Sequence, residues 1–384
     1  MKNQNSVYRM LPVLMAFYVM GFPDIVGVAT SYVKTEFGLT NTITQGLTIL
    51  AFVWFALLSI PVGVFQDKYS KRFTVMLGIL FIAAGMLAPI ISYTFYGMMA
   101  SFTLMGIGNA IIQVSANPLM QDVSPADKLS RNLTLSQFVK AIAGILGPII
   151  ATFCASHFGN WTLIYWVYLA ISLLTIIWLR FTHIPETANT GRASIGSALK
   201  LLSDRRVALL VLGTFLMVGF DVGMNTNIPD YLKSSFHVSQ EEGSRGISIY
   251  FAALAIGRFL SVMILNKIEG NRLLLYCVLL SIVAFFSMYL MQGYMGGCVA
   301  IFCTGLFTAT IFPLIFSAGL QYMPDRANEL SGLMIMSVCG GGIIPPIVGL
   351  ISDMSSLLTG MVLLGGCLGY VVFLSVYIGK TVRP

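Results

Sequence analysis

Four charged side chains stand inside long apolar stretches of this sequence. They are Asp24, Lys140, Asp221 and Arg258. An ionised group surrounded by lipid is costly, so such residues normally face a water-filled cavity or a partner of opposite charge. The two acids are suited to take up a proton or, as hard oxygen ligands, a Na+ ion. Because the sequence shows no nucleophile-and-base pair, phosphate-binding loop or metal-ligand cluster, we expect no enzyme.

Amide side chains accompany these charges at helical spacing, where residues three or four apart share one face. Such pairs are Gln113 with Asn117, Gln137 with Lys140, and Asp221 with Asn225. They predict a polar cavity that can hydrogen-bond a small polar solute. The candidate substrate-binding residues are Gln113, Asn117, Gln137, Lys140, Asn225 and Asn227, and the candidate ion-coupling residues are Asp24 and Asp221.

Each of these residues also has a purely structural interpretation. Asp24 or Asp221 can neutralise Lys140 and do no more. The amide pairs can hydrogen-bond neighbouring helices to each other. Arg258 lies near one end of its apolar stretch, where a long side chain can reach the interface, and we interpret it as structural.

The elements that must position these residues are membrane-spanning helices. Of the 384 residues, 57% are hydrophobic and only 10% are charged, whereas soluble domains carry roughly 25% charged residues. The segments 73–121 and 273–324 contain no Asp, Glu, Lys or Arg, and each can hold two spans of about 20 residues. We predict an all-α polytopic membrane protein with twelve spans, at residues 8–33, 43–66, 73–92, 95–121, 131–155, 161–181, 207–232, 245–266, 273–292, 295–321, 329–352 and 356–379.

Basic residues are unevenly distributed between the loops on the two sides of these spans. Most of the 22 Lys and Arg residues lie in the loops on the same side as the two termini. Since cytoplasmic loops are rich in Lys and Arg, both termini are predicted to be cytoplasmic, in a plasma membrane such as the bacterial inner membrane. The net charge of +7 follows from this bias, and we expect no nucleic-acid partner.

The longest polar stretch, residues 182–206, lies at the midpoint of the chain. We predict that it is a cytoplasmic linker between an N-terminal six-helix bundle, 1–181, and a C-terminal six-helix bundle, 207–384. The first apolar stretch is too long for a cleavable signal peptide, so we assign it as the first span.

The two halves resemble each other, which predicts two pseudo-symmetric bundles. Leu129-Ser130 opens the fifth span after a polar turn, and Leu330-Ser331 opens the eleventh span in the same way. Gly147-Pro148 in the fifth span is matched by Pro345-Pro346 in the eleventh. Internal repeats of this size often place a transport site between the halves near the bilayer midplane.

The loop after the second span reads Gly63-Val64-Phe65-Gln66-Asp67-Lys68-Tyr69-Ser70-Lys71-Arg72. It fills every fixed position of the pattern Gly-x-x-x-Asp-(Arg/Lys)-x-x-(Arg/Lys)-(Arg/Lys), the signature of the major facilitator superfamily, which the chain therefore resembles. Glycine permits a short turn, and the acid suits a helix N-terminus or a basic partner. The resemblance implies that the halves are latched on the cytoplasmic side by Gly63, Asp67, Lys68, Lys71 and Arg72.

Within that superfamily the chain resembles the fucose/galactose/glucose symporter family. Residues 113–118 resemble its Glu-x-x-Ala-Asn-Pro segment, residues 312–317 its Pro-x-Ile-Phe-Ser stretch, and residues 340–353 its eleventh helix. The resemblance implies the superfamily's fold and the symport of a sugar with H+ or Na+ by alternating access. It also implies a monomer in the lipid bilayer that needs no cofactor.

Departures from that family's pattern lead to two hypotheses. The family's proton-linked glutamate of the fourth span is Gln113 here, and its aspartate of the first span aligns with Gly27. Coupling would therefore have moved to Asp24 and Asp221, the latter standing where many members have glutamate. Lys140 replaces an amide and can pair with a carboxylate, which favours an acidic sugar (a uronate, an aldonate or a sialic acid). The rival is an internal Lys140–Asp pair with a neutral sugar.

The alternative function for the same fold is a drug or metabolite exporter. Such exporters tend to have apolar, aromatic cavities, whereas the amides and Lys140 favour a defined polar solute. We expect no firm metal site, and a Na+ ion at Asp24 or Asp221 is the one candidate.

Overall fold

The computed structural model describes residues 2–25, 29, 32–34, 36–38, 41–187 and 193–381, with side chains left out for 2–7, 41–52, 240, 241, 244, 380 and 381. Within these residues the chain is helical and contains no β-strand. The helices before residue 201 are α1 (Lys2–Met20), η1 (Phe22–Ile25), α3 (Asn41–Lys68), α4 (Lys71–Ile91), α5 (Phe95–Val123), α6 (Leu129–Phe158), α7 (Leu163–Phe181) and α8 (Ile195–Lys200). Those after it are α9 (Arg205–Phe236), α10 (Gln240–Ile264), α11 (Gly270–Ser287), α12 (Tyr294–Thr308), α13 (Ile311–Tyr322), α14 (Ala327–Met336), α15 (Gly340–Met354) and α16 (Leu357–Thr381).

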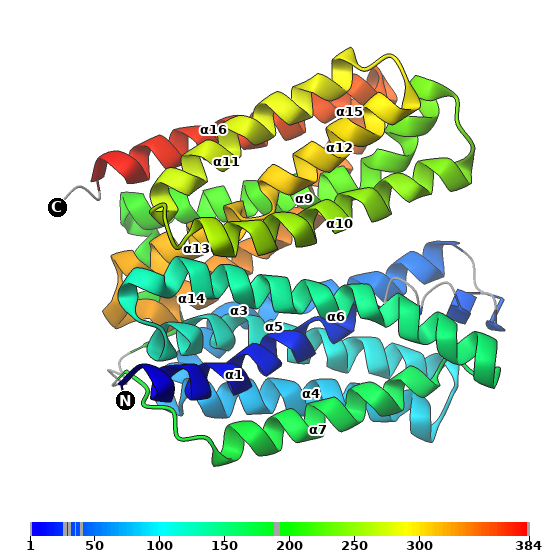
Figure 1. Cartoon of the computed structure of the whole chain (residues 1–384). Helices are drawn as coiled ribbons and strands as arrows, with labels where there is room; N and C mark the ends of the chain where they lie inside the picture. Colours follow the sequence, from blue (N-terminus) through cyan, green and yellow to red (C-terminus); the bar gives the residue numbers. More distant parts are fainter. Residues whose placement is uncertain are drawn as a thin grey trace. The chain divides into compact units, whose positions relative to one another are not determined.

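The helices agree with the spans predicted from the sequence (Figure 1). Among the described residues, 10 helical segments are long and apolar enough to cross a membrane, and they coincide with the third to twelfth predicted spans. The first two predicted spans, 8–33 and 43–66, extend over residues outside the described set, and α1 and α3 occupy their described parts. The all-helical, polytopic fold class is therefore confirmed.

Two of the spans contain helix breaks. The tenth span is divided into α12 and α13 at Ala309 and Thr310, and the eleventh is divided into α14 and α15 by a 3-10 turn at Ser337–Cys339. Pro313 has no N–H to donate to the carbonyl of Ala309, the usual partner four residues earlier. Breaks of this kind are tolerated in a membrane only where other groups satisfy the freed backbone atoms.

The chain divides into two compact units. Unit 1 comprises Met1–Ala126, Ser136–Leu201 and Met323–Met336, and unit 2 comprises Asp127–Leu135, Leu202–Tyr322 and Ser337–Pro384. These units differ from the two halves proposed from the sequence in two short segments. The start of α6 belongs to unit 2, and α14 at the start of the eleventh span belongs to unit 1.

Glycines allow close helix packing inside each unit. In unit 1, α4 crosses α5 where a Cβ atom at position 108 would lie 2.5 Å from the carbonyl oxygen of Gly78. In unit 2, α10 crosses α12 where a Cβ atom at position 305 would lie 2.9 Å from the carbonyl oxygen of Tyr250. Small residues are typical of helix interfaces in membranes, because contact there comes from packing at short range. The second crossing fixes the position of Tyr250.

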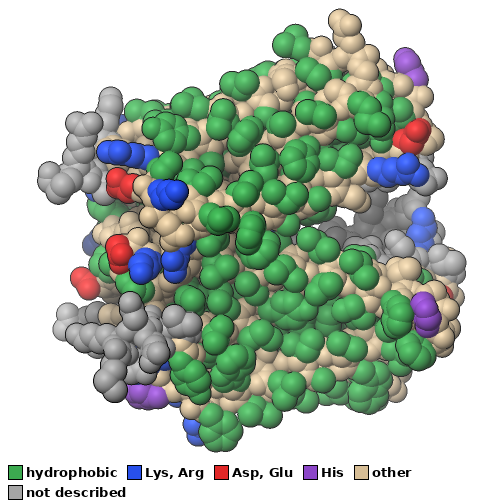
Figure 2. Space-filling model, viewed as in Figure 1, with side chains coloured by type: hydrophobic (Ala, Val, Ile, Leu, Met, Phe, Trp, Pro, Cys, Tyr) green, Lys and Arg blue, Asp and Glu red, His purple; other side chains and the backbone are tan. Residues whose placement is uncertain are grey.

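The outer faces of the helices are apolar. Large hydrophobic side chains such as Leu174, Val283 and Leu350 are more than 60% exposed. Figure 2 shows that hydrophobic side chains cover the middle of the helices, whereas the charged side chains gather towards their ends. An exposed surface of this kind is suited to lipid, which cannot hydrogen-bond and excludes charge.

Candidate functional site: two polar latches and two intramembrane acids

The signature loop joins α3 to α4 and approaches α14 within unit 1. A Cβ atom at position 332 would lie 2.6 Å from the carbonyl oxygen of Ser59 and 3.2 Å from the Cα atom of Gly63, so both positions require glycine. Ser70 then caps α4 by accepting a hydrogen bond from the backbone N–H of Phe73. The turn expected at Gly63 is wrong, because Gly63 lies inside α3, and its lack of a side chain instead lets two helix backbones approach closely.

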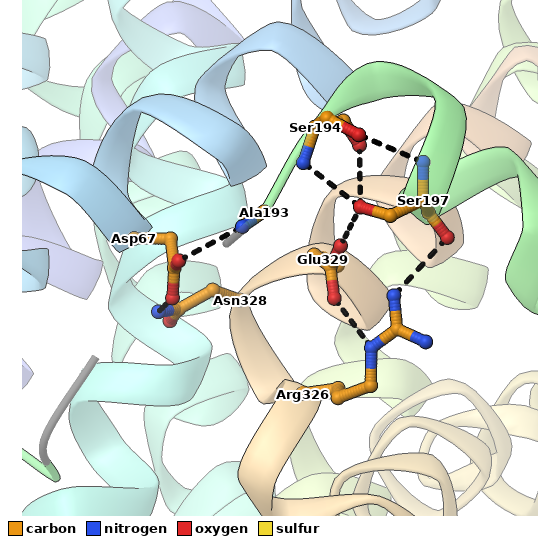
Figure 3. Close-up of polar contacts among 7 residues, drawn as sticks. All are labelled: Asp67, Ala193, Ser194, Ser197, Arg326, Asn328 and Glu329. Atoms are coloured by element: carbon orange, nitrogen blue, oxygen red, sulfur yellow. Dashed lines mark hydrogen bonds and ion pairs between the residues drawn. The ribbon is translucent and has the colours of Figure 1, made fainter. Parts of the chain in front are cut away.

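Asp67 is the centre of the first polar cluster (Figure 3). Its carboxylate accepts hydrogen bonds from the Asn328 side-chain amide at 3.1 Å and from the backbone N–H of Ala193 at 3.3 Å. The neighbouring Gln66 amide donates to the backbone carbonyl of Asn328 at 3.2 Å. Asp67 is 7% exposed, so these bonds form largely away from water and involve a charged acceptor, which makes them stronger than neutral ones.

A second set of bonds ties the short helix α8 to the start of α14 (Figure 3). Ser194 and Ser197 form a reciprocal capping box at the start of α8. The Ser197 hydroxyl donates to Glu329, and Arg326 donates to Glu329 at 2.6 Å and to the Ser197 carbonyl at 3.1 Å. We call the whole set the first latch: Asp67, Ala193, Ser197, Arg326, Asn328 and Glu329.

The basic residues of the signature loop have separate roles. Lys71 forms an ion pair with Asp122 at 2.6 Å, and the two side chains are 3% and 2% exposed. Arg72 donates to the backbone carbonyl of Thr182 at 2.6 Å, and Glu186 accepts from the backbone N–H groups of both basic residues. Lys68 is exposed and lies over the ring of Tyr69. Lys71 and Arg72 therefore hold the end of α5 and the start of the linker, and neither is bonded to α14.

Unit 2 contains a similar cluster, which we call the second latch: Ser130, Arg131, Asn266 and Ser317. Arg131 donates to the side-chain oxygen of Asn266 at 2.9 Å, and the Ser130 and Ser317 hydroxyls are 2.8 Å apart. In unit 1 the matching Ser331 donates to the backbone carbonyl of Val114 at 2.6 Å. The repeat Leu129-Ser130 and Leu330-Ser331 thus places one serine against the tenth span and the other against the fourth, but Ser130 meets a hydroxyl and Ser331 a backbone carbonyl.

Asp24 and Lys140 are the intramembrane charges of unit 1. Asp24 is exposed, and its carboxylate lies against α6, where a Cβ atom at position 144 would be 3.1 Å from Asp24 Oδ2. Lys140 lies one turn earlier on α6, is half-buried, and makes neither an ion pair nor a hydrogen bond in the described part of unit 1. Helix α1 packs on the backbone of Lys140, because a Cβ atom at Gly21 would lie 2.5 Å from its carbonyl oxygen.

The amides of unit 1 are buried in α5 and α6. Gln113 and Gln137 are each 6% exposed and Asn117 is 2% exposed. The Asn117 amide donates to the backbone carbonyl of Gln113 at 2.6 Å, which uses one donor within its own helix. The hydroxyl of Tyr168, which stacks on Phe22 with ring centroids 3.8 Å apart, is buried without a hydrogen-bond partner among the described residues.

Asp221 is the intramembrane acid of unit 2. Its carboxylate accepts a hydrogen bond from the Tyr250 hydroxyl at 2.6 Å, and Tyr250 is fully buried. Along the same helix, the Asn227 amide donates to the backbone carbonyl of Gly223 at 2.7 Å. The side-chain oxygen of Asn225 is buried and accepts no hydrogen bond within the described residues. Asn225 is therefore an amide of α9 whose acceptor is not used by any described residue.

Arg258 has a specific partner that the sequence did not reveal. Its Nε atom donates to the backbone carbonyl of Ala309 at 3.3 Å, the carbonyl that Pro313 leaves without its usual donor. Nearby, the hydroxyls of Ser261 and Thr310 are 2.7 Å apart. Arg258 thus supplies a donor for the backbone carbonyl freed at the break of the tenth span, which agrees with its structural interpretation.

Several residues of these polar clusters were not predicted from the sequence. Asn328, Glu329 and Ser197 of the first latch lie far along the chain from the signature loop, and Tyr250 is one tyrosine among 16. The internal repeat is the sequence pattern that could have indicated the first latch, because it aligns the start of the eleventh span with the start of the fifth. Among the described residues no group of three His, Cys, Asp or Glu side chains could hold a metal ion.

A family model described as the Major Facilitator Superfamily matches residues 13–346. The chain belongs to the Major Facilitator Superfamily. It is thus an integral membrane transporter, and neither the family nor its structural neighbours are enzymes. A likeness to the crystal structure of FucP, a Major Facilitator Superfamily transporter in the outward conformation, gives a TM-score of 0.85 at 18% identity, covering 97% of this chain and 99% of that one. At this identity the likeness shows the fold alone.

Relatives of this Major Facilitator Superfamily member extend over nearly the whole chain. A putative glucose/galactose transporter of Helicobacter pylori is 26% identical over 361 residues, which covers 88% of this chain and 87% of the relative. A glucose/galactose transporter of Brucella abortus is 21% identical over 391 residues, which covers 97% of this chain and 94% of the relative. The resemblance stated from the sequence is thereby confirmed.

Proposed function

We propose that the chain is a secondary active transporter that symports a sugar, and specifically an acidic sugar, with H+ or Na+ by alternating access. The names of the two relatives support a sugar as the solute. The Lys and Arg distribution supports a plasma membrane, such as the bacterial inner membrane, with both termini cytoplasmic. We expect it to act as a monomer.

The observation that carries the acidic-sugar proposal is the environment of Lys140. This lysine lies within a membrane span, yet it forms no ion pair or hydrogen bond in the described part of unit 1. An intramembrane cation needs an anion or water, and the rival internal pair with Asp24 is not formed in this structure. A uronate, aldonate or sialic acid would bring the missing carboxylate, and Gln137 one turn away would bond its hydroxyl groups.

Coupling is proposed at the two intramembrane acids, Asp24 and Asp221. When a carboxylate that leaves water takes up a proton or a Na+ ion, an isolated charge is removed and the cost of enclosing it falls. Binding of the cation would therefore favour closure of the cavity around the solute. The buried acceptor of Asn225, one turn from Asp221, would add an oxygen ligand for Na+.

The first and second latches are proposed to open and close during alternating access. In the first latch α14, which belongs to the C-terminal half of the sequence, is bonded to α3 and α8 from the N-terminal half. Breaking these bonds is required before the start of the eleventh span can separate from the second. The signature residues Gly63 and Asp67 are thereby given a role in the conformational cycle.

The test is solute uptake into proteoliposomes with matched pairs of probes. D-glucuronate is compared with D-glucose, and D-galacturonate with D-galactose, each across pH and with or without Na+. We expect the acids to be transported better, and Lys140→Met to raise the KM of the acids about 10–100-fold, as for a lost charged hydrogen bond. Lys200→Met, at an exposed position of α8, is the matched control.

Other outcomes decide between the alternatives. If only neutral hexoses are transported, and Lys140→Met leaves their KM unchanged, the acidic-sugar proposal fails and a neutral-sugar symporter remains. If no sugar is taken up but a lipophilic compound is expelled, the exporter alternative replaces the whole proposal.

A further inference from the structure

The fourth span carries a third buried amide, which was not predicted from the sequence. Asn109 lies four residues before Gln113 and eight before Asn117 on α5, so the three amides follow one face of that helix. Asn109 is 5% exposed and is thus as deeply buried as the other two. The polar face of α5 is therefore one turn longer than the candidate site.

The side-chain oxygen of Asn109 is an unused acceptor. It is buried and accepts no hydrogen bond from any described residue. Buried amide oxygens are nearly always hydrogen-bonded in proteins, because an unsatisfied acceptor in apolar surroundings costs stability. Such an oxygen can accept a donor from a bound solute.

Helix packing sets the direction in which Asn109 leaves α5. The preceding residue, Gly108, packs on α4 so closely that a Cβ atom there would lie 2.5 Å from the carbonyl oxygen of Gly78. This contact fixes the rotation of α5 about its axis. Since consecutive helical residues are about 100° apart, Asn109 is turned away from the α4 contact, whereas Ser115, seven residues after Gly108, lies on the α4 side.

The equivalent position of unit 2 contains no such acceptor. Thr304 lies nine residues before Pro313 in the tenth span, as Asn109 lies nine residues before Pro118 in the fourth. Thr304 is fully buried, and its hydroxyl donates to the backbone carbonyl of Ala300 at 2.8 Å within the same helix. The repeated fold therefore does not require an unused acceptor at this position, and the one at Asn109 is particular to unit 1.

We propose that Asn109 is a further specificity-determining residue, whose side-chain oxygen accepts a hydrogen bond from a hydroxyl group of the solute. This inference rests on the proposed sugar symport and deepens it: Lys140 recognises the carboxylate, and Asn109 recognises a hydroxyl. A buried acceptor discriminates strongly against a solute that lacks the matching donor, because the acceptor then stays dehydrated and unpaired.

The first experiment measures uptake into proteoliposomes, with whichever of D-glucuronate, D-galacturonate, D-glucose or D-galactose the wild type transports. Asn109→Leu removes the acceptor and keeps the side chain close to its size. We expect its KM to rise about 5–10-fold, as for one lost hydrogen bond. Its midpoint of thermal unfolding should not fall, because an apolar group replaces an unsatisfied polar one.

Ser115→Ala is the matched control. The Ser115 hydroxyl is also buried in α5 without a hydrogen-bond partner among the described residues, but it lies on the α4 side. We expect Ser115→Ala to keep the KM within about twofold. A rise as large as that of Asn109→Leu would mean that the loss of any buried polar group of α5 weakens transport, and would contradict the specific role of Asn109.

A second experiment identifies the hydroxyl group. The probes are the 2-, 3- and 4-fluorodeoxy derivatives of the transported sugar, because fluorine is close in size to a hydroxyl group but cannot donate a hydrogen bond. In the wild type we expect one of the derivatives to raise the KM about 5–10-fold. In Asn109→Leu the same derivative should change the KM no further, and this non-additivity pairs that hydroxyl with Asn109.

Two results overturn the inference: an unchanged KM in Asn109→Leu, or fluorine substitutions that have the same effects in the variant as in the wild type. If Asn109→Leu does not fold, Asn109→Ala is measured in the same way and must show the same loss. Failure of the proposed function is distinct, since it would show as no sugar transport by the wild type, and this inference would fall with it.

Discussion

The two units of this transporter each place one acid and one base within the membrane, and they arrange them in opposite ways. In unit 2, Asp221 accepts a hydrogen bond from Tyr250, and Arg258 donates one to the backbone carbonyl of Ala309. In unit 1, Asp24 packs against Gly144 of α6, and Lys140 lies one turn away on the same helix. Lys140 forms no ion pair in the described part of that unit. Both charges of unit 2 thus have a hydrogen-bond partner within the protein, whereas Lys140 of unit 1 has none in the described part of that unit.

This difference indicates that the two repeats of the fold can use their intramembrane charges for different roles. Both halves share the same pattern of spans, and equivalent helices carry the two acids. A charge bound by its own protein supports structure, whereas a charge without such a partner supports binding. The proposal that unit 1 recognises the solute follows from this contrast.

The largest expected effect is the loss of stability on truncating Arg258, in contrast to Lys140. Arg258→Ala removes the donor for the buried Ala309 carbonyl and leaves that acceptor unsatisfied, so we expect a loss of about 3 kcal/mol in unfolding free energy. Lys140→Ala breaks no ion pair, so a change of about 0.5 kcal/mol is expected. Thermal unfolding of the purified variants in one detergent gives both values. Equal destabilisation would remove the contrast between the units.

The next effect concerns the first latch. Asp67→Ala removes an ionised acceptor of two hydrogen bonds, and should shift the equilibrium away from the latched state by about 1.5–3 kcal/mol. The measurement is maleimide labelling of a cysteine placed at Ser331, which is fully buried against α5 in this structure. We expect faster labelling in Asp67→Ala, and unchanged labelling in Lys200→Ala. If the cysteine at position 331 stays protected from maleimide in Asp67→Ala, the Asp67 carboxylate does not hold α14.

A smaller effect is expected at Asp204, which caps α9 and accepts a hydrogen bond from Tyr322 at 2.9 Å. Burial raises the pKa of this carboxyl, but hydrogen bonds from the N–H of Val207 and from Tyr322 outweigh it and hold the pKa below its ordinary value of 3.8. The stabilisation is therefore present at neutral pH and is lost as the pH falls through the lowered pKa. Asp204→Ala should cost about 1 kcal/mol near pH 7, read from urea unfolding. A cost that instead grew on acidification would contradict the assigned sign.

The smallest effect is expected in the second latch. Asn266 is exposed and accepts one hydrogen bond, from Arg131 at 2.9 Å. Because water competes for this bond, Asn266→Ala should change the unfolding free energy by about 0.5 kcal/mol. Cysteine labelling at Ser130, compared with that at Ser331, tests whether the two latches differ. If Asn266→Ala speeds labelling at Ser130 as much as Asp67→Ala speeds labelling at Ser331, the two latches contribute equally.

Much of the fold followed from the sequence because spans are set by local composition. The third to twelfth predicted spans coincide with membrane-length helical segments, such as 95–121 with α5. The helix breaks were harder to place. The donor that satisfies the Ala309 carbonyl comes from another helix, 51 residues earlier in the chain, and no local pattern indicates it.

The candidate site was predicted in part. Sequence spacing identified the acids, Lys140 and the amides, and their roles in binding remain proposals. It did not predict that Asn117 bonds within its own helix, or that Tyr250 donates to Asp221. Helical periodicity gives the face on which a residue lies but not the neighbour that the face meets.

By itself the sequence determined the membrane location, the helical spans, the family and the positions of the four intramembrane charges along them. The reason is that the bilayer excludes water, so hydropathy and charge act residue by residue along the chain. Only the tertiary structure decided which polar groups meet, since Arg258 and its acceptor Ala309 are 51 residues apart, and Asp67 and Asn328 are 261 residues apart. Contacts of that range depend on helix packing, and glycines such as Gly63 and Gly332 set how closely the helices approach.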